Sequence, residues 1–94
     1  TSDVLCDRAV LEKGRIEKIV RAIEGIRDCH EIRTRGSIEC VHVDLHVLVD
    51  ADMTVADSHG LANKVERDIR ADIQGVCDVV VHVEPLTHEH GELK

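Results

Sequence analysis

The chain has 94 residues, with 19 acidic and 12 basic side chains, and a formal net charge of −7. This length suits one domain rather than two. The negative charge argues against nucleic acid as a partner, because phosphate binding requires a basic face, and it favours the attraction of cations. Phe, Tyr and Trp are absent, so the core must consist of Val, Ile, Leu and Ala. Small aliphatic cores of this kind often gain stability from a partner chain or a bound ion.

The first predicted element is a helix that follows a short lead-in over residues 1–8. Apolar residues recur in it at spacings of three and four, which places them on one stripe. Gly25 is expected to end this helix. The stripe consists of Ile16, Ile19, Val20, Ile23 and Ile26.

Two strands are predicted next, over residues 29–35 and 38–49, with a tight turn at residues 36–37. The second strand alternates cleanly between apolar and polar side chains, with Leu48 as the one apolar exception on the polar face. Its apolar face consists of Val41, Val43, Leu45, Val47 and Val49. Its other face consists of Cys40, His42, Asp44, His46 and Asp50.

A second helix is predicted to start at Thr54, because Thr54 and Asp57 have the spacing of a helix cap and the third helical residue. Its core stripe is Leu61, Ala62, Val65, Ile69 and Ile73, and Gly75 is expected to end it. A third strand over residues 78–84 is expected to stop at Pro85, where a polar, flexible tail over residues 86–94 begins.

The predicted order is helix, strand, strand, helix, strand, so the fold class is α+β with a three-stranded mixed sheet and two helices on one face. The strand–helix–strand unit at the end should cross over right-handed, which makes the second and third strands parallel. We expect a single domain over residues 1–94, with its core at about residues 11–85. Since both helices would cover the valine face, the other face of the sheet stays open.

This open face carries the candidate metal ligands. Imidazole and carboxylate groups converge there if the second and third strands are neighbours, and a neutral imidazole is the commonest protein ligand for metals. His59, early in the second helix, flanks the core and could lean past the sheet edge. The expected ligands are His46, His59, His82 and Glu84, and the additional candidates are Asp44, His42, Cys40, His88 and His90.

These ligand types suit a divalent transition metal. Zinc is the first expectation, and iron(II), manganese(II), cobalt(II) and nickel(II) use the same donors. His30 and His42 are interpreted as surface residues, and His88 and His90 as parts of a solvated tail.

The cysteines form no CxxC pair, and no signal peptide precedes them, which predicts reduced thiols in the cytosol. They are Cys6, Cys29, Cys40 and Cys77.

No apolar run is long enough to span a bilayer. The chain begins with Thr rather than Met, so we expect a fragment of a longer protein. No nucleophile–base pair, acid–base pair of carboxylates or Gly-rich phosphate loop is found, so an enzyme is not expected.

Three segments resemble the C-terminal cytoplasmic domain of the cation diffusion facilitator transporters. They are HEIRTRGS (30–37), VDLHVLVDADMTVADSH (43–59) and DVVVHVEP (78–85). The resemblance runs from about Leu11 to Pro85 and implies a ferredoxin-like, metallochaperone-like fold. It also implies an upstream membrane part that exchanges divalent metal for protons. Family members include iron carriers of magnetosome membranes.

The same resemblance implies a V-shaped homodimer on the cytoplasmic side of a membrane, closed by metal near the dimer interface. His46, His59 and His82 match ligand positions of the family, and Glu84 stands where some members carry Asp. Asn63 departs from members that place a second His there. The leading hypothesis is a regulatory metal sensor of a cation efflux protein. The alternatives are a dimerisation platform with little metal sensing and a free-standing metallochaperone.

Overall fold

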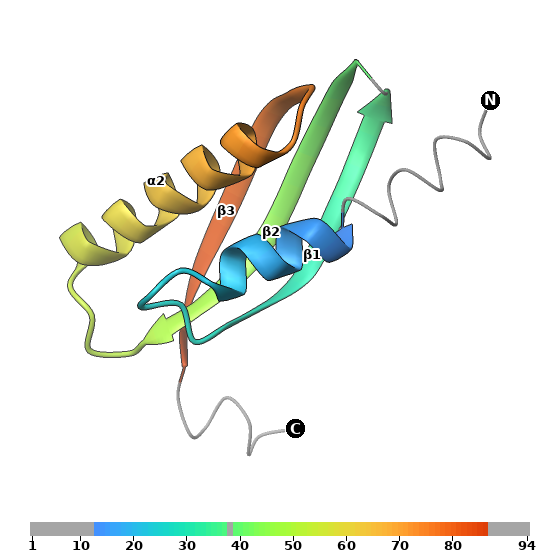
Figure 1. The fold of residues 1–94 in the computed structure, drawn as a ribbon. Helices are drawn as coiled ribbons and strands as arrows, with labels where there is room; N and C mark the ends of the chain where they lie inside the picture. The colour runs from blue at the N-terminus through green and yellow to red at the C-terminus, as the bar shows by residue number, and fades with distance from the viewer. Residues whose placement is uncertain (1–12, 38, 87–94) are drawn as a thin grey trace.

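The computed structural model describes residues 13–37 and 39–86, and it contains the predicted order of elements. An N-terminal helix covers residues 13–21 and is followed by β1 (Asp28–Ser37), β2 (Cys40–Asp50), α2 (Val55–Asp72) and β3 (Val76–Leu86). The sheet is three-stranded, and both helices lie against the same face of it (Figure 1). The lead-in over residues 1–8 and residues 87–94 of the predicted tail, with His88 and His90, lie outside the described residues, whereas Leu86 belongs to β3 and not to a tail. Within the described part of the chain, no helix combines the length and apolarity needed to cross a bilayer.

The sheet has β2 in its centre, between β1 and β3. β1 pairs with β2 in antiparallel orientation, and β2 pairs with β3 in the predicted parallel orientation. The apolar face of β2 is buried along its whole length, and Leu45 and Val47 are fully buried. The alternation read from the sequence therefore decides which face meets the helices and which face stays open.

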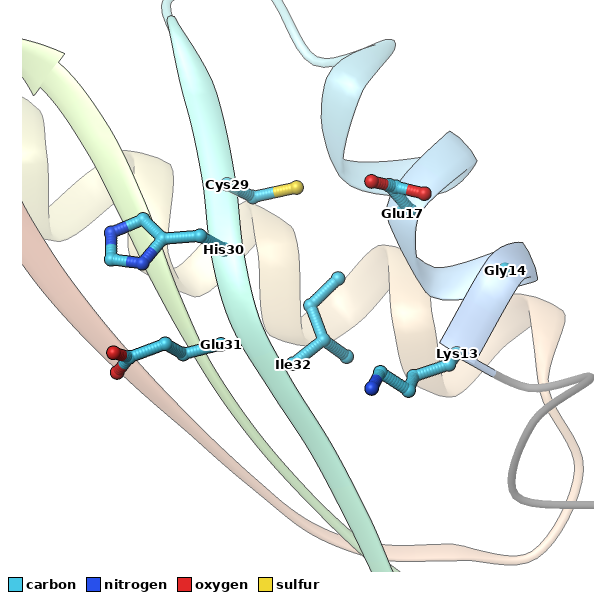
Figure 2. Close-up of a pocket in the computed structure, with 7 residues that line it drawn as sticks. All are labelled: Lys13, Gly14, Glu17, Cys29, His30, Glu31 and Ile32. Carbon is cyan, nitrogen blue, oxygen red and sulfur yellow. The ribbon is translucent and has the colours of Figure 1, made fainter.

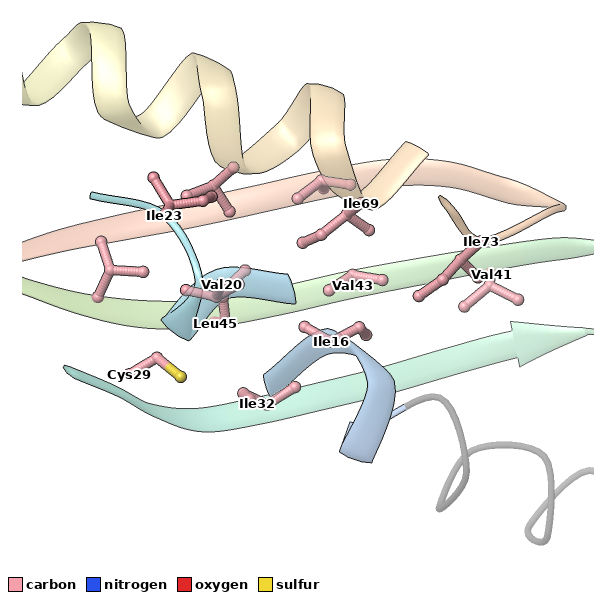
Figure 3. Close-up of a cluster of buried hydrophobic side chains, with 13 residues drawn as sticks. Ile16, Val20, Ile23, Cys29, Ile32, Val41, Val43, Leu45, Ile69 and Ile73 are labelled. Carbon is pink, nitrogen blue, oxygen red and sulfur yellow. The ribbon is translucent and has the colours of Figure 1, made fainter. Parts of the chain in front are cut away.

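The core fills the space between this face and both helices, as Figure 3 shows. It is entirely aliphatic apart from one thiol, that of Cys29, whose pKa is raised by burial. The buried cluster is Ile16, Val20, Ile23, Cys29, Ile32, Val41, Val43, Leu45, Val47, Val65, Ile69, Ile73 and Val79.

Both helices end earlier than the sequence predicted. The N-terminal helix ends at residue 21, after which the backbone tightens, because the N–H of Ile23 donates to the carbonyl of Val20 at 3.1 Å. Gly25 lies in the following turn with φ of 99°. α2 begins as predicted, with the N–H of Asp57 donating to Thr54 Oγ1 at 3.0 Å. It ends at Asp72, and the predicted stop, Gly75, lies in the next turn.

The strand boundaries also differ from the prediction. β1 continues through the expected turn to Ser37, and β2 starts only at Cys40. β3 runs through Pro85, which pairs with Val49. Proline is tolerated there because β3 is an edge strand, and an edge strand makes ladder hydrogen bonds on one side only.

The expectation of reduced cysteines is wrong for one pair, since Cys40 and Cys77 form a disulfide. Strand register, and not the cellular compartment, decides this pairing. β2 and β3 start side by side, and this brings the two Cα atoms to 5.2 Å, inside the range that a disulfide requires. Cys29 is a free, buried thiol.

Candidate metal centre

Three histidines lie in one row across the sheet, each from a different strand. In the strand register, His30 of β1 is opposite His46 of β2, and His46 is opposite His82 of β3. The rings of His46 and His82 stack, with centroids 4.6 Å apart, and those of His30 and His46 are 5.3 Å apart. We call these three residues the histidine row. Its position on the open face leaves the rings accessible from solvent.

Glu84 joins two members of the row. One of its oxygens lies 2.6 Å from Nδ1 of His46, and the other lies 3.3 Å from Nε2 of His30. The hydrogen bond with His46 is the main cause that lowers the pKa of Glu84 below its usual 4.5, with the bond to His30 adding to it. Glu84 is therefore held as a carboxylate, the form that binds a metal ion.

A β-bulge in β1 brings a second carboxylate to His46. The register shifts by one residue between His30 and Arg33, and Glu31 within this shift has φ of 53°. Its Oε1 lies 3.1 Å from Nε2 of His46. Bulges of this kind often lie beside functional sites, because the extra residue redirects a side chain. Both ring nitrogens of His46 thus face carboxylates, and an ion that binds this ring would displace one of them.

Asp44 is paired with the third member of the row. Its Oδ1 lies 3.1 Å from Nε2 of His82, close enough for an ion pair if that ring is protonated. Among the described residues, this buried oxygen is left without a hydrogen-bond partner. A buried carboxylate oxygen in that state is costly unless a cation or water satisfies it.

Two ligand groups follow from these contacts, and they share His46. In each group the ligand atoms lie within 4.8 Å of one another. Donors on a tetrahedral zinc ion lie about 3.4 Å apart for Zn–N and Zn–O distances of about 2.1 Å, so small side-chain rotations suffice for binding. The first group is His30, His46 and Glu84, and the second group is Asp44, His46 and His82.

The structure brings together most, but not all, of the residues singled out in the sequence. His46, His82 and Glu84 converge, with Asp44 beside them. His59 is exposed on α2 and belongs to neither group. His42 lies on the open face but contacts Cys40 instead, with 3.8 Å between Nε2 and Sγ.

Sequence reasoning missed two residues of the site, His30 and Glu31. The sequence predicts a surface position for His30, but the register places it in the histidine row. A signal was present, because Cys29 and Ile32 are both apolar and are three residues apart. A regular strand cannot bury both on one face, so one extra residue, a bulge, had to lie between them.

A small pocket of about 210 Å³ lies between the N-terminal helix and β1. Figure 2 shows Cys29 and Ile32 pointing toward the helix, and His30 and Glu31 pointing away from it. The volume is below the range of about 300–1,000 Å³ that small-molecule sites occupy. We therefore assign no ligand to this pocket.

Residues 10–86 match the family model described as cation efflux protein, cytoplasmic domain. The chain belongs to this family. It is 34% identical over 85 residues to the cation-efflux pump FieF of Cronobacter sakazakii, covering 88% of this chain and 28% of the pump. It is 37% identical over 68 residues to the magnetosome protein MamB of Magnetospira sp., covering 72% of this chain and 23% of MamB. The cation efflux domain thus spans about a quarter of these relatives' length.

Solved structures share the fold of this cation efflux domain. A variant of MamM-CTD in which one histidine is replaced by alanine superposes with a TM-score of 0.77 at 21% identity, over 82% of this chain and 96% of that one. A nickel form of MamM CTD superposes with a TM-score of 0.76 at 19% identity, over 82% of this chain and 98% of that one. The family consists of transporter domains and not of enzymes.

Proposed function

We propose that this cation efflux domain senses a divalent metal ion on its open sheet face and thereby regulates transport by the protein of which it is part. The observation that carries the proposal is the histidine row with its two carboxylates. His46 stands in the middle, Glu84 bridges it to His30, and Asp44 faces His82. Three imidazoles and two carboxylates are a donor set for first-row divalent ions.

The residues present fit such an ion. Oδ1 of Asp44 is buried without a hydrogen bond among the described residues, which is the state that a bound cation would relieve. Glu84 is held ionised by its neighbours. The donors would supply binding and charge neutralisation. We place zinc first, followed by iron(II), manganese(II), cobalt(II) and nickel(II), because the nitrogen and oxygen donors suit all of them.

The relatives make this range of ions reasonable to test. MneS of Bacillus subtilis, 33% identical over 70 residues, is named a manganese efflux system protein. MamM CTD variants have been solved in nickel and cadmium forms. These names describe the relatives.

Regulation requires a second state, and we propose that a homodimer supplies it. The family model, ZT_dimer, is named for a dimer. Two copies that each carry a net charge of −7 repel each other, and a bound ion reduces that repulsion. Metal can shift the dimer toward a closed form only if it binds that form more tightly. His59, exposed on α2, is free to complete the site from the partner protomer in the closed form.

The proposal is tested by titrating the chain with zinc, manganese(II) and iron(II) in a calorimeter and by measuring its small-angle X-ray scattering with and without the ion. Wild type should release heat at a defined stoichiometry and become more compact as a dimer. His46→Ala should abolish both effects, because His46 belongs to both ligand groups. His42→Ala is the matched control, because His42 lies on the same strand but outside both groups. This variant is measured with its Cys40–Cys77 disulfide intact and should behave like wild type. Absence of heat and of compaction in wild type would refute the proposal.

A dimerisation platform with little metal sensing is the second candidate. The exposed apolar residues Val80 and Leu86, which share the open face of β3, favour it, because they offer contact area that needs no metal. Substituting His46, His59 and His82 together by Ala separates the two functions. A dimer of unchanged shape, with unchanged transport by the full-length protein, would favour the platform.

A further inference from the structure

A second cluster of metal-binding side chains lies on the open face, at the start of β2, whereas the histidine row crosses the middle of that strand. It consists of Cys40 and His42 of β2 and Cys77 of β3. We propose that, when the Cys40–Cys77 disulfide is reduced, the two thiolates and the imidazole of His42 bind one thiophilic metal ion, such as zinc or cadmium. The disulfide then acts as the redox gate of this site.

The distances suit an ion that is bound by sulfur and nitrogen together. Sγ of Cys40 lies 3.8 Å from Nε2 of His42. On a tetrahedral zinc ion with Zn–S of about 2.3 Å and Zn–N of about 2.05 Å, a sulfur and a nitrogen donor lie about 3.6 Å apart. The Cα atoms of the two cysteines are 5.2 Å apart. That spacing permits the disulfide, and after reduction it permits two sulfurs about 3.8 Å apart on one ion.

The backbone positions these groups before any ion arrives. The parallel register of β2 and β3 shifts between Val41 and His42, and Cys77 is the extra residue on β3 at that shift. Across from them on β1, Gly36 leaves the space beside His42 open. A Cβ at Gly36 would come within 3.2 Å of Cδ2 of His42. The strand shift thus brings Cys77 to the cluster, and the absence of a side chain at Gly36 leaves space for the His42 ring. All three donor groups therefore fit on one face of the sheet.

This cluster is separate from the histidine row. The nearest donors of the two sites, His42 and Asp44, are two residues apart on one strand, or about 7 Å at the usual rise per residue, and His42 lies about 13 Å from His46. Neither cysteine belongs to the two groups around His46. Occupation of one site therefore does not require donors from the other, and the two sites also differ in kind. Thiolates select softer ions than imidazole and carboxylate do.

The redox step needs an external thiol. Two molecules of a glutathione-type thiol, or one dithiol, give two electrons and two protons to the Cys40–Cys77 bond and become a disulfide themselves. Both cysteines are then thiols, and the incoming ion displaces their two protons. Oxidation by a disulfide of the same class reverses the sequence, releases the ion and closes the bond. Metal occupancy thus follows the thiol–disulfide balance of the surroundings.

The test uses cobalt(II) and cadmium as spectroscopic probes. Because the chain contains no Phe, Tyr or Trp, charge-transfer bands between thiolate and metal can be read in the ultraviolet without aromatic absorption. The chain is reduced with a phosphine, freed of it by gel filtration under nitrogen, and titrated. We expect thiolate bands that saturate at one ion per chain. The air-oxidised chain, with a Cys40–Cys77 disulfide confirmed by peptide mapping, should show none.

Variants assign the bands to the cluster. Cys40→Ser/Cys77→Ser should abolish them, and His42→Ala should weaken binding about tenfold or more. His46→Ala is the matched control and should keep them, because it disables only the histidine row. Cys29→Ala should also keep them, since that thiol is buried in the core.

Three results would overturn the proposal. They are a reduced wild type without thiolate bands, bands that survive in the double serine variant, and bands of equal strength in the oxidised chain. If a variant does not fold, the wild-type chain still decides the matter through alkylation. Cadmium should slow the reaction of iodoacetamide with Cys40 and Cys77 in the reduced chain, and equal rates with and without cadmium would contradict the site.

Discussion

At the bulge residue Glu31, a Gly substitution should give a more stable protein than an Ala substitution, which is the reverse of the usual order. In most backbone positions Ala is more favourable than Gly by about 0.5–1 kcal/mol, because Gly loses more conformational freedom on folding. Glu31 has φ of 53°, in the left-handed region, where a side chain costs roughly 1–2 kcal/mol that Gly does not incur. At this position Gly should therefore be more stabilising than Ala.

The magnitude follows from these terms. Glu31→Gly removes the left-handed strain, which is stabilising. It also introduces the entropic cost of Gly and removes the ion pair with His46, which are both destabilising. That pair is worth little, because the Glu31 side chain is 53% exposed. The balance favours Gly over wild type by about 0.5 kcal/mol, or a rise in Tm of about 2–4 °C for a domain of this size. Glu31→Ala keeps the strain and loses the pair, so it should lie about 1 kcal/mol below the Gly variant.

The assay is thermal and urea unfolding followed by far-ultraviolet circular dichroism in the presence of a chelator, since the chain has no aromatic residue for fluorescence. Glu31→Gln is the control that keeps the strain and removes only the charge, and its stability should stay close to that of wild type. If Ala proves equal to or more stable than Gly, the left-handed backbone at Glu31, and with it the reasoning about the bulge, is refuted.

Three further predictions concern the core, a helix cap and acid stability. Leu45→Ala should lower the free energy of unfolding by about 2–5 kcal/mol, because Leu45 is fully buried. A loss below about 1 kcal/mol, measured by urea unfolding, would contradict the position of Leu45 in the centre of the core. Thr54→Ala should cost about 1 kcal/mol through loss of the α2 cap, and Thr54→Asn, which can cap as well, should restore most of it. The pKa of Glu84 is lowered from 4.5 by its bond with His46, so its carboxylate stabilises the metal-free fold above about pH 4.5. That contribution is lost as the pH falls through the lowered pKa. Wild type should therefore be more stable than Glu84→Gln at neutral pH and converge with it under acid conditions, and a constant difference down to low pH would contradict the assignment.

The fold was predictable because hydrophobic periodicity carries most of its information. The apolar alternation of β2 indicated which face is buried, and the Thr54–Asp57 spacing located the start of α2. The element ends were less accurate, since a glycine marks a turn rather than the last hydrogen bond of a helix. Gly25 and Gly75 both lie a few residues beyond the helix ends, with positive φ.

The candidate site was only partly predictable, because it depends on register. The convergence of His46, His82 and Glu84 required only that β2 and β3 be neighbours. The place of His30 in the row depends on how β1 is aligned with β2, and that alignment includes a bulge. The Cys40–Cys77 bond likewise depends on a local shift between two strands. Pairings of this kind arise from tertiary contacts and have no periodic signal in the sequence.

The histidine row has a consequence for the lifetime of the chain. Its members are 16 and 36 residues apart in sequence, at positions 30, 46 and 82. An ion bound by the first ligand group, His30, His46 and Glu84, would tie three strands together and close two long loops. A cross-link of long loops restricts the unfolded chain most. At an ion concentration 100 times Kd, binding would add about 2.7 kcal/mol to the free energy of unfolding. A cell poor in metal would then hold a chain that opens more often and meets its proteases sooner, so metal supply would set the abundance of this domain as well as its shape.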